Sequence, residues 1–167
     1  MAPFRGCLIG RFQPFHSGHL RLVERIAEDV DELVIGIGSA DASHTRRNPF
    51  TAGERVMMIR KTLESHDITD YVVPIEDLER NSVWVSHVKS MAPEFDVAYS
   101  NNSLVVRLFS EAGIEVRQTE MFDRDDLKGS EIRRQMVDDG DWRQHVPEPV
   151  QAVIEEIDGV GRLREIE

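Results

Sequence analysis

Short apolar runs alternate with segments of helical periodicity along most of this chain. The first run, residues 7–9, is followed by residues 20–28, where apolar side chains recur at the spacing of one helix face. A second run, residues 33–37, is continuously apolar, which is typical of a strand covered on both faces of a sheet. The chain therefore opens with a predicted strand, helix and strand.

The same alternation continues to the end of the chain. Thr51 and Glu54 form a capping-box pattern, and Ser130 is a second predicted N-cap. Five strand–helix alternations with short connections predict a parallel sheet with helices on both faces. The later predicted elements are a helix from Thr51 to about residue 65, a strand at 71–75, a helix from Asn81 or Ser82 to about Met91, a strand at 95–99, a helix from Asn102 to Ala112, a strand at 114–117, and helices at 130–140 and 148–157.

Length and composition limit the class of protein. A chain of 167 residues is most simply one domain, residues 1–167, because domains take roughly 100–200 residues. Hydrophobic residues make up 40% of it, but no run reaches the length of a membrane span, so we expect no membrane partner. The single cysteine cannot form an internal disulfide, which favours the reducing cytoplasm. Residues 119–128 are the longest irregular stretch and a candidate mobile loop.

The charge balance argues against one large class of partner. A net charge of −11 is unsuited to general nucleic-acid binding, which needs a basic face. The chain has 17 arginines, only 3 lysines and 31 acidic residues. This composition fits adaptation to high salt, where charge repulsion is screened, and it equally fits an ordinary acidic cytoplasmic protein. Basic residues near a motif are therefore candidates for function.

The segment from Gly10 to His19 is the strongest chemical signal in the chain. It lies where the first predicted strand passes into the first helix, and ligands of open parallel sheets bind at such junctions. The N-terminus of a helix offers N–H groups and positive dipole charge to phosphate. His16 and His19 add side-chain donors, so the segment predicts a polyphosphate site.

Other interpretations of the two histidines remain open. Both could be surface residues, or they could be zinc ligands, although no further ligand set completes a metal site. The chain has no Walker A sequence, and Gly36-Ile37-Gly38 lacks the third glycine of a dinucleotide fingerprint because Asp41 stands there.

The sequence G-R-F-Q-P-F-H-S-G-H resembles the H-x-G-H signature of the nucleotidylyltransferase superfamily, and most closely the archaeal-type nicotinamide mononucleotide adenylyltransferases. The resemblance continues in the same order over nearly the whole chain. Its further blocks are residues 36–40, 43–45, 48–55, 81–84 and 129–134.

The resemblance implies a Rossmann-like, doubly wound parallel sheet of five strands in the order 3-2-1-4-5. It also implies transfer of the adenylyl group of ATP to nicotinamide mononucleotide, giving NAD and pyrophosphate, by direct in-line attack of the mononucleotide phosphate on the α-phosphate. Mg²⁺ is expected to arrive with ATP rather than in a dedicated protein site. The family further suggests a homo-oligomer, namely a hexamer.

Site residues follow from the matching positions. His16, His19 and Arg133 are the catalytic candidates, and Asn81 and Trp84 the candidates for binding the nicotinamide nucleotide. The candidates for binding ATP are Gly10, Arg11, Phe12, Gln13, Gly18, Ser39, Arg47, Asn102 and Ser130. Arg46 is a weaker alternative to its neighbour Arg47.

Two of these assignments have ordinary structural alternatives. Ser130 and Arg133 could be a helix cap and a surface arginine, and Trp84 could be a core residue. The chain also departs from the family pattern, with Lys128 in place of the usual serine, and with Asn101 and Ser103 in place of glycine and proline.

Two other functions remain open at this point. One is a sister nucleotidylyltransferase with a different phosphorylated acceptor, and the other is a non-catalytic nucleotide sensor. The sequence does not distinguish an amidated from a deamidated mononucleotide.

Overall fold

The computed structural model describes residues 1–119 and 125–166, without the side chains of residues 125–128. Five parallel strands form one sheet in the order β3-β2-β1-β4-β5, which confirms the predicted fold class and strand order. The strands are β1 (Arg5–Gly10), β2 (Glu32–Ile37), β3 (Asp70–Pro74), β4 (Val97–Tyr99) and β5 (Glu115–Arg117). The order reverses between β1 and β4, so the edge beyond their carboxyl ends is the expected ligand site.

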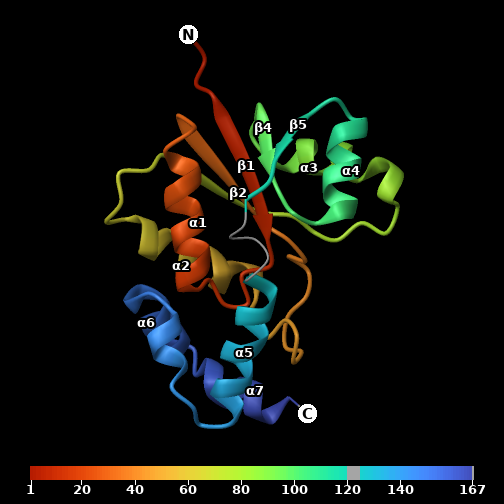
Figure 1. Cartoon of the computed structure of the whole chain (residues 1–167). Coiled ribbons are helices and arrows are strands. Elements are labelled where there is room, and N and C mark those ends of the chain that lie inside the picture. Colours follow the sequence, from red (N-terminus) through yellow and green to blue (C-terminus); the bar gives the residue numbers. More distant parts are fainter. Residues whose placement is uncertain (120–124, 167) are drawn as a thin grey trace.

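Helices cover both faces of the sheet (Figure 1). On one side lie α1 (Ser17–Ala27) and α2 (Ala52–Leu63), and this layer continues past the carboxyl edge in α5 (Asp125–Val137), α6 (Glu148–Glu156) and α7 (Gly159–Glu165). On the other side lie α3 (Trp84–Met91) and α4 (Ser103–Glu111). Short 3₁₀ turns, η1 (Asn81–Val83) and η3 (Trp142–His145), precede α3 and α6. Within the described residues, no helix is long and apolar enough to cross a membrane.

Alternation along the strands divides the core in two. Leu8 and Ile35 pack into the cluster shared with α1 and α2, whereas their neighbours Cys7 and Val34 pack into the cluster shared with α3 and α4. All four side chains are buried. Successive residues of a strand point to opposite faces, so one continuously apolar strand supplies both cores.

Two predicted helix caps, those at the starts of α5 and α3, differ from the structure. α5 begins at Asp125, so Ser130 lies inside the helix and the prediction that it is an N-cap is wrong. The acidic pair Asp125-Asp126 is typical of a first helical turn. The predicted cap at Asn81 or Ser82 is also wrong, because η1 starts there without a side-chain cap. Residues 125–128 of the predicted loop belong to α5, so that part of the prediction is wrong, and residues 120–124 lie outside the described residues. The elements η3 and α7 were not predicted.

The capping box at α2 is confirmed and extends to the last helix. The Thr51 N–H donates to Glu54 Oε1 at 2.8 Å, and the Glu54 N–H donates to Thr51 Oγ1 at 3.1 Å. Arg162 of α7 donates from Nη1 and Nη2 to the two Glu54 carboxylate oxygens, at 2.6 and 2.9 Å. Glu54 therefore joins the C-terminal helix to the start of α2.

Replacing Glu54 with glutamine should destabilise the protein at neutral pH by about 1–2 kcal/mol, because the charge-assisted pair with Arg162 is lost. Burial raises the pKa of Glu54, but the hydrogen bonds from Arg162 and Thr51 outweigh it and hold the pKa below 4.5. The stabilisation is thus complete above pH 4.5 and is lost as pH falls through the lower pKa of the folded state.

Thermal melts across this pH range test the prediction. The difference between wild type and Glu54→Gln should shrink in acid, whereas Glu111→Gln, in an exposed pair with Arg107, should change little at any pH. A difference that persists unchanged in acid would contradict it.

Candidate active site

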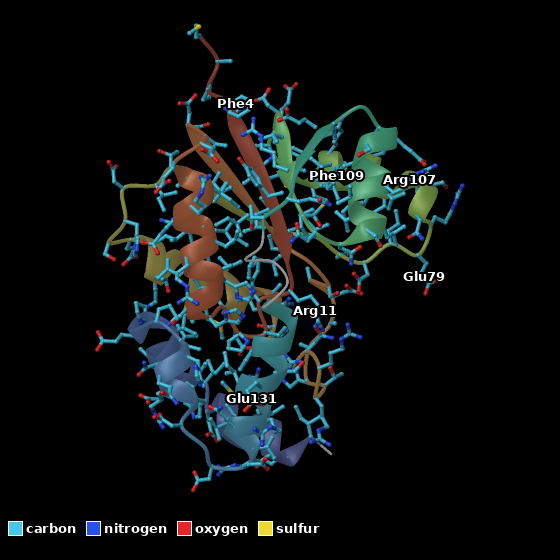
Figure 2. All side chains as sticks on the ribbon, viewed as in Figure 1. Phe4, Arg11, Glu79, Arg107, Phe109 and Glu131 are labelled. Atoms are coloured by element: carbon cyan, nitrogen blue, oxygen red, sulfur yellow. The ribbon has the colours of Figure 1, made fainter. Side chains whose placement is uncertain are left out.

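A cavity of about 620 Å³ opens at the carboxyl edge of the sheet, where β1 and β4 end. Most of the predicted site residues line it. These are Gly10, Arg11, Phe12, Gln13, His19, Ser39, Arg47, Trp84, Asn102 and Arg133. In Figure 2, Arg11 lies at the lower end of β1, between the sheet and α5. The cavity thus collects basic groups and an aromatic ring from segments far apart in the sequence.

Four predicted residues do not line the cavity: His16, Gly18, Asn81 and Ser130. His16 and Gly18 are buried at the start of α1, while Asn81 and Ser130 are exposed. The predicted ligand contacts of these four residues therefore stay predictions.

His16 and His19 cap the start of α1 together. Nδ1 of His16 accepts from the N–H groups of Gly18 and His19, at 3.1 and 3.3 Å. Nδ1 of His19 accepts from the His16 N–H at 3.1 Å. The two rings are stacked, with centroids 3.6 Å apart. The N–H groups of Gly18 and His19 are therefore already bound to His16, and the prediction that this helix start offers its N–H groups to phosphate is wrong for these two residues.

This arrangement fixes the protonation of both rings. A ring nitrogen that accepts from an amide N–H carries no proton, so the proton of each neutral ring lies on Nε2. Two stacked imidazolium cations would also repel one another. Nε2 is therefore the nitrogen of each ring that can donate, and on His19, which lines the cavity, such a donor suits a phosphate oxygen.

The loop after β1 is held by buried side chains. The Gln13 amide exchanges two hydrogen bonds with the Phe50 backbone: Nε2 donates to O at 3.0 Å, and Oε1 accepts from N at 2.9 Å. The Phe12 ring packs under Gly10, where an added Cβ would lie 2.9 Å from the ring. Gln13 and Phe12 shape the cavity while being almost fully buried.

Arg133 of α5 reaches the same loop. Its Nη1 donates to the Gln13 carbonyl at 2.8 Å, and its Nη2 donates to Ser130 Oγ at 3.3 Å. A side chain at Gly129 would come within 3.3 Å of Arg133 Nη1, so this glycine leaves room for the guanidinium. Ser130 thus orients Arg133 from outside the cavity.

Trp84 and the start of α4 form another part of the cavity wall. Trp84 is partly buried, lies edge-on to Phe109 with ring centroids 5.3 Å apart, and faces the cavity. Trp84 is therefore both a core residue and a cavity residue, whereas the sequence analysis treated these as alternatives. Oδ1 of Asn102 caps α4 by accepting from the N–H groups of Leu104 and Val105.

Sequence reasoning missed an acidic part of the cavity wall. Glu76 and Asp77 follow β3, and Ser39 Oγ donates to Asp77 Oδ1 at 3.1 Å. Asn101 was predicted only as a neighbour of Asn102, but its Oδ1 accepts from the Thr119 N–H and so joins the segments after β4 and β5. The missed residues follow strand ends, which is the signal that could have found them.

Arg55 was also missed. It is fully buried in α2 and donates to five backbone carbonyls, those of Arg11, Gly38, Ser39, Ala42 and Thr51. Burial, followed by repulsion from Arg11, lowers the pKa of Arg55 to about 10, so it stays charged at neutral pH. Its spacing from the buried Met58 and Ile59 was the available signal.

Comparison with known proteins agrees with this geometry. The model of the cytidylyltransferase-like family matches residues 7–135. Curated relatives named nicotinamide-nucleotide adenylyltransferase include proteins of Haloarcula marismortui, 67% identical over 97% of this chain and 86% of the relative, and Halobacterium salinarum, 64% identical over 97% and 92%. A relative of the same name from Methanolobus tindarius is 59% identical over 97% and 94%.

The chain belongs to the archaeal-type nicotinamide-nucleotide adenylyltransferases of the cytidylyltransferase-like family. The sequence resemblance indicated this same family, and the observed sheet has the strand order that the resemblance implied.

Solved structures share the adenylyltransferase fold at low sequence identity. A bifunctional NMN adenylyltransferase/ADP ribose pyrophosphatase from Francisella tularensis, complexed with AMP and a manganese ion, superposes with a TM-score of 0.77 at 21% identity, over 98% of this chain and 52% of that chain. The NadR protein in complex with NAD and AMP-PNP superposes with a TM-score of 0.68 at 14% identity, over 92% and 47%. This chain therefore spans about half the length of those proteins.

The histidine arrangement predicts a spectroscopic result. Long-range ¹H–¹⁵N correlation spectra at neutral pH should show His16 and His19 as Nε2–H tautomers, assigned through the signals lost in His16→Gln and His19→Gln. The exposed His44, which lies outside the start of α1, serves as the reference for assignment. An Nδ1–H tautomer or a doubly protonated ring at His19 would refute the capping arrangement.

Proposed function

We propose that this enzyme joins ATP and nicotinamide mononucleotide by a single in-line displacement. An oxygen of the mononucleotide 5′-phosphate forms a bond to the α-phosphorus of ATP, the bond from that phosphorus to the α–β bridging oxygen breaks, and pyrophosphate leaves with its electron pair. The attacking phosphate is already ionised at neutral pH, since its second pKa is about 6, so no general base is needed. The products are NAD and pyrophosphate.

The observation that carries this proposal is the division of one cavity into two chemical regions. Arg11, Arg47 and Arg133 contribute to its lining from the loops after β1 and β2 and from α5, whereas Trp84 belongs to the wall at α3. The arginines suit polyphosphate and the indole suits a cationic pyridinium ring. The identity to relatives named for this activity favours it over a sister enzyme with another acceptor and over a nucleotide sensor.

Catalysis on this proposal rests on placement and on charge stabilisation. His19 donates from Nε2 to the reacting α-phosphate, while Arg11 and Arg133 neutralise the departing pyrophosphate. His16 is buried against His19 and acts by holding that ring. Gly10, Ser39 and Asn102 provide the surface for the rest of ATP.

The mononucleotide is proposed to stack its pyridinium on Trp84. Asn81, which is exposed in η1, is the proposed partner of the carboxamide and would have to turn inward to meet it. Whether the enzyme prefers the amidated or the deamidated mononucleotide is read from the assay described below.

Mg²⁺ is proposed to arrive with the triphosphate. In residues 1–119 and 125–166, no group of three or more His, Cys, Asp or Glu residues is placed to hold a metal ion. Phosphate oxygens and water would supply the ligands, which suits an ion that dehydrates reluctantly. The ion would neutralise charge on the triphosphate.

Three broader assignments stay as proposals. Residues 1–167 form one nucleotidylyltransferase domain, supported by the Glu54–Arg162 pair that joins α7 to α2. A cytoplasmic location is supported by the single, buried cysteine Cys7. The homo-oligomer, a hexamer by resemblance, is tested by the mass of the protein in solution.

The function is tested by supplying the enzyme with ATP, Mg²⁺ and a panel of phosphorylated acceptors. We expect equal amounts of pyrophosphate and dinucleotide with nicotinamide mononucleotide, and little of either with other acceptors. Trp84→Ala should raise the KM for the mononucleotide by about 5- to 30-fold through lost stacking, with Trp84→Phe intermediate and the KM for ATP nearly unchanged.

Trp142→Phe is the matched control, because Trp142 is buried at η3 and does not line the cavity. It should lower thermal stability and leave both KM values close to those of wild type. Pyrophosphate release with a different acceptor, or equal loss of both substrates in Trp84→Ala, would count against the proposal.

A further inference from the structure

Arg55 lies behind the cavity and binds the backbone of the residues that line it. Its Nη1 donates to the carbonyls of Arg11 and Gly38, both at 2.9 Å, and its Nη2 donates to the carbonyls of Ser39 and Ala42, at 3.1 and 3.3 Å. Nε donates to the Thr51 carbonyl at 3.2 Å. A guanidinium has five N–H groups, and all five are used here.

The carbonyls that Arg55 binds flank strained backbone. Phe12 and Ser39 have φ values of 52° and 48°, in the left-handed region that side chains other than glycine rarely occupy. The Arg11 carbonyl directly precedes Phe12, and those of Gly38 and Ser39 lie on either side of Ser39. Such conformations persist only when the surroundings fix them, and the guanidinium fixes the peptide groups beside both residues.

The two loops are also joined to each other at the cavity. The Gly38 N–H donates to the Gly10 carbonyl at 2.8 Å, and Arg11 Nη1 donates to Asn48 Oδ1 at 3.3 Å. Arg47 precedes Asn48 in the second loop. The positions of Arg11 and Arg47 relative to each other therefore depend on the backbone that Arg55 holds.

Among the described residues, no hydrogen bond of Arg55 reaches the part of the cavity wall that holds Trp84 and Asn102. Each carbonyl that Arg55 binds belongs to the loops after β1 and β2 or to the start of α2, whereas Trp84 and Asn102 stand on segments after β3 and β4. Loss of Arg55 should thus weaken binding at the polyphosphate end of the cavity more than binding at the nicotinamide end.

The hydrogen bonds of Arg55 indicate that it does more than fill space in the core. No ion pair of Arg55 is found among the described residues, and its N–H groups all meet neutral carbonyls. Lysine has three donors on a single nitrogen and cannot reproduce a fork that spans three segments.

We propose that Arg55 is a positioning residue for ATP: its guanidinium sets the two loops so that Arg11, Ser39 and Arg47 meet the polyphosphate together. This inference rests on the proposed function for the identity of the nucleotide. Arg55 touches no substrate, and it acts through the backbone alone.

Arg55→Lys and Arg55→Met test the role, with Arg60→Lys and Arg60→Met as controls. Arg60 is exposed on the same helix and pairs with Asp70. Arg55→Lys should raise the KM for ATP about tenfold and Arg55→Met about 100-fold, as expected for the loss of charge-assisted hydrogen bonds. The KM for the mononucleotide should rise less than about threefold, and the Arg60 variants should keep both KM values.

Calorimetric titration with a non-reactive ATP analogue, without any acceptor, repeats the test independently of turnover. Wild type that binds the analogue but makes no NAD would refute the proposed function and leave Arg55 testable by affinity. Equal loss toward both substrates, or unchanged ATP affinity in folded Arg55→Lys, would overturn the positioning role. Failure of both Arg55 variants to fold would also overturn it, since Arg55 would then serve the whole fold.

Discussion

The buried guanidinium of Arg55 connects the backbone of three segments that the sequence separates. It lies at zero exposure, and carbonyls from the loops after β1 and β2 and from the start of α2 satisfy its five donors. Burying such a charge is costly unless every donor finds a partner, so the segments are restricted to the arrangement that supplies them. That arrangement sets the cavity wall before any ligand arrives.

Other polar side chains around the cavity also bind backbone groups. His16 and His19 use Nδ1 to cap α1, and Asn102 uses Oδ1 to cap α4. Each polar side chain thereby has its orientation fixed by a helix start. Fixed donors at a site of developing charge need no reorganisation during reaction, which is the main requirement of phosphoryl chemistry between two phosphates.

Local patterns were sufficient to predict the five strands, the helices that connect them and the Thr51–Glu54 capping box, because each depends on neighbours a few residues apart. Arg55 could not be predicted in its role, since its partners are carbonyls 13, 16, 17 and 44 residues away, with Thr51 nearby, and backbone groups leave no side-chain signature. The start of α5 was misplaced because serine is a common N-cap residue, and the sequence alone does not show that Ser130 lies inside a helix that begins at Asp125. The mutual capping of His16 and His19 was hidden for a similar reason: their spacing suggests ligand donors and helix caps equally.

The central claim is that two substrates react directly in a preformed cavity, with no covalent intermediate on the enzyme. The most direct measurement is the stereochemical course at the α-phosphorus, followed with ATP that carries one sulfur at that phosphorus in a known configuration. A single in-line displacement predicts inversion of configuration in the phosphorothioate analogue of NAD. Retention would mean two displacements through an adenylylated side chain, and it would contradict this account of the site.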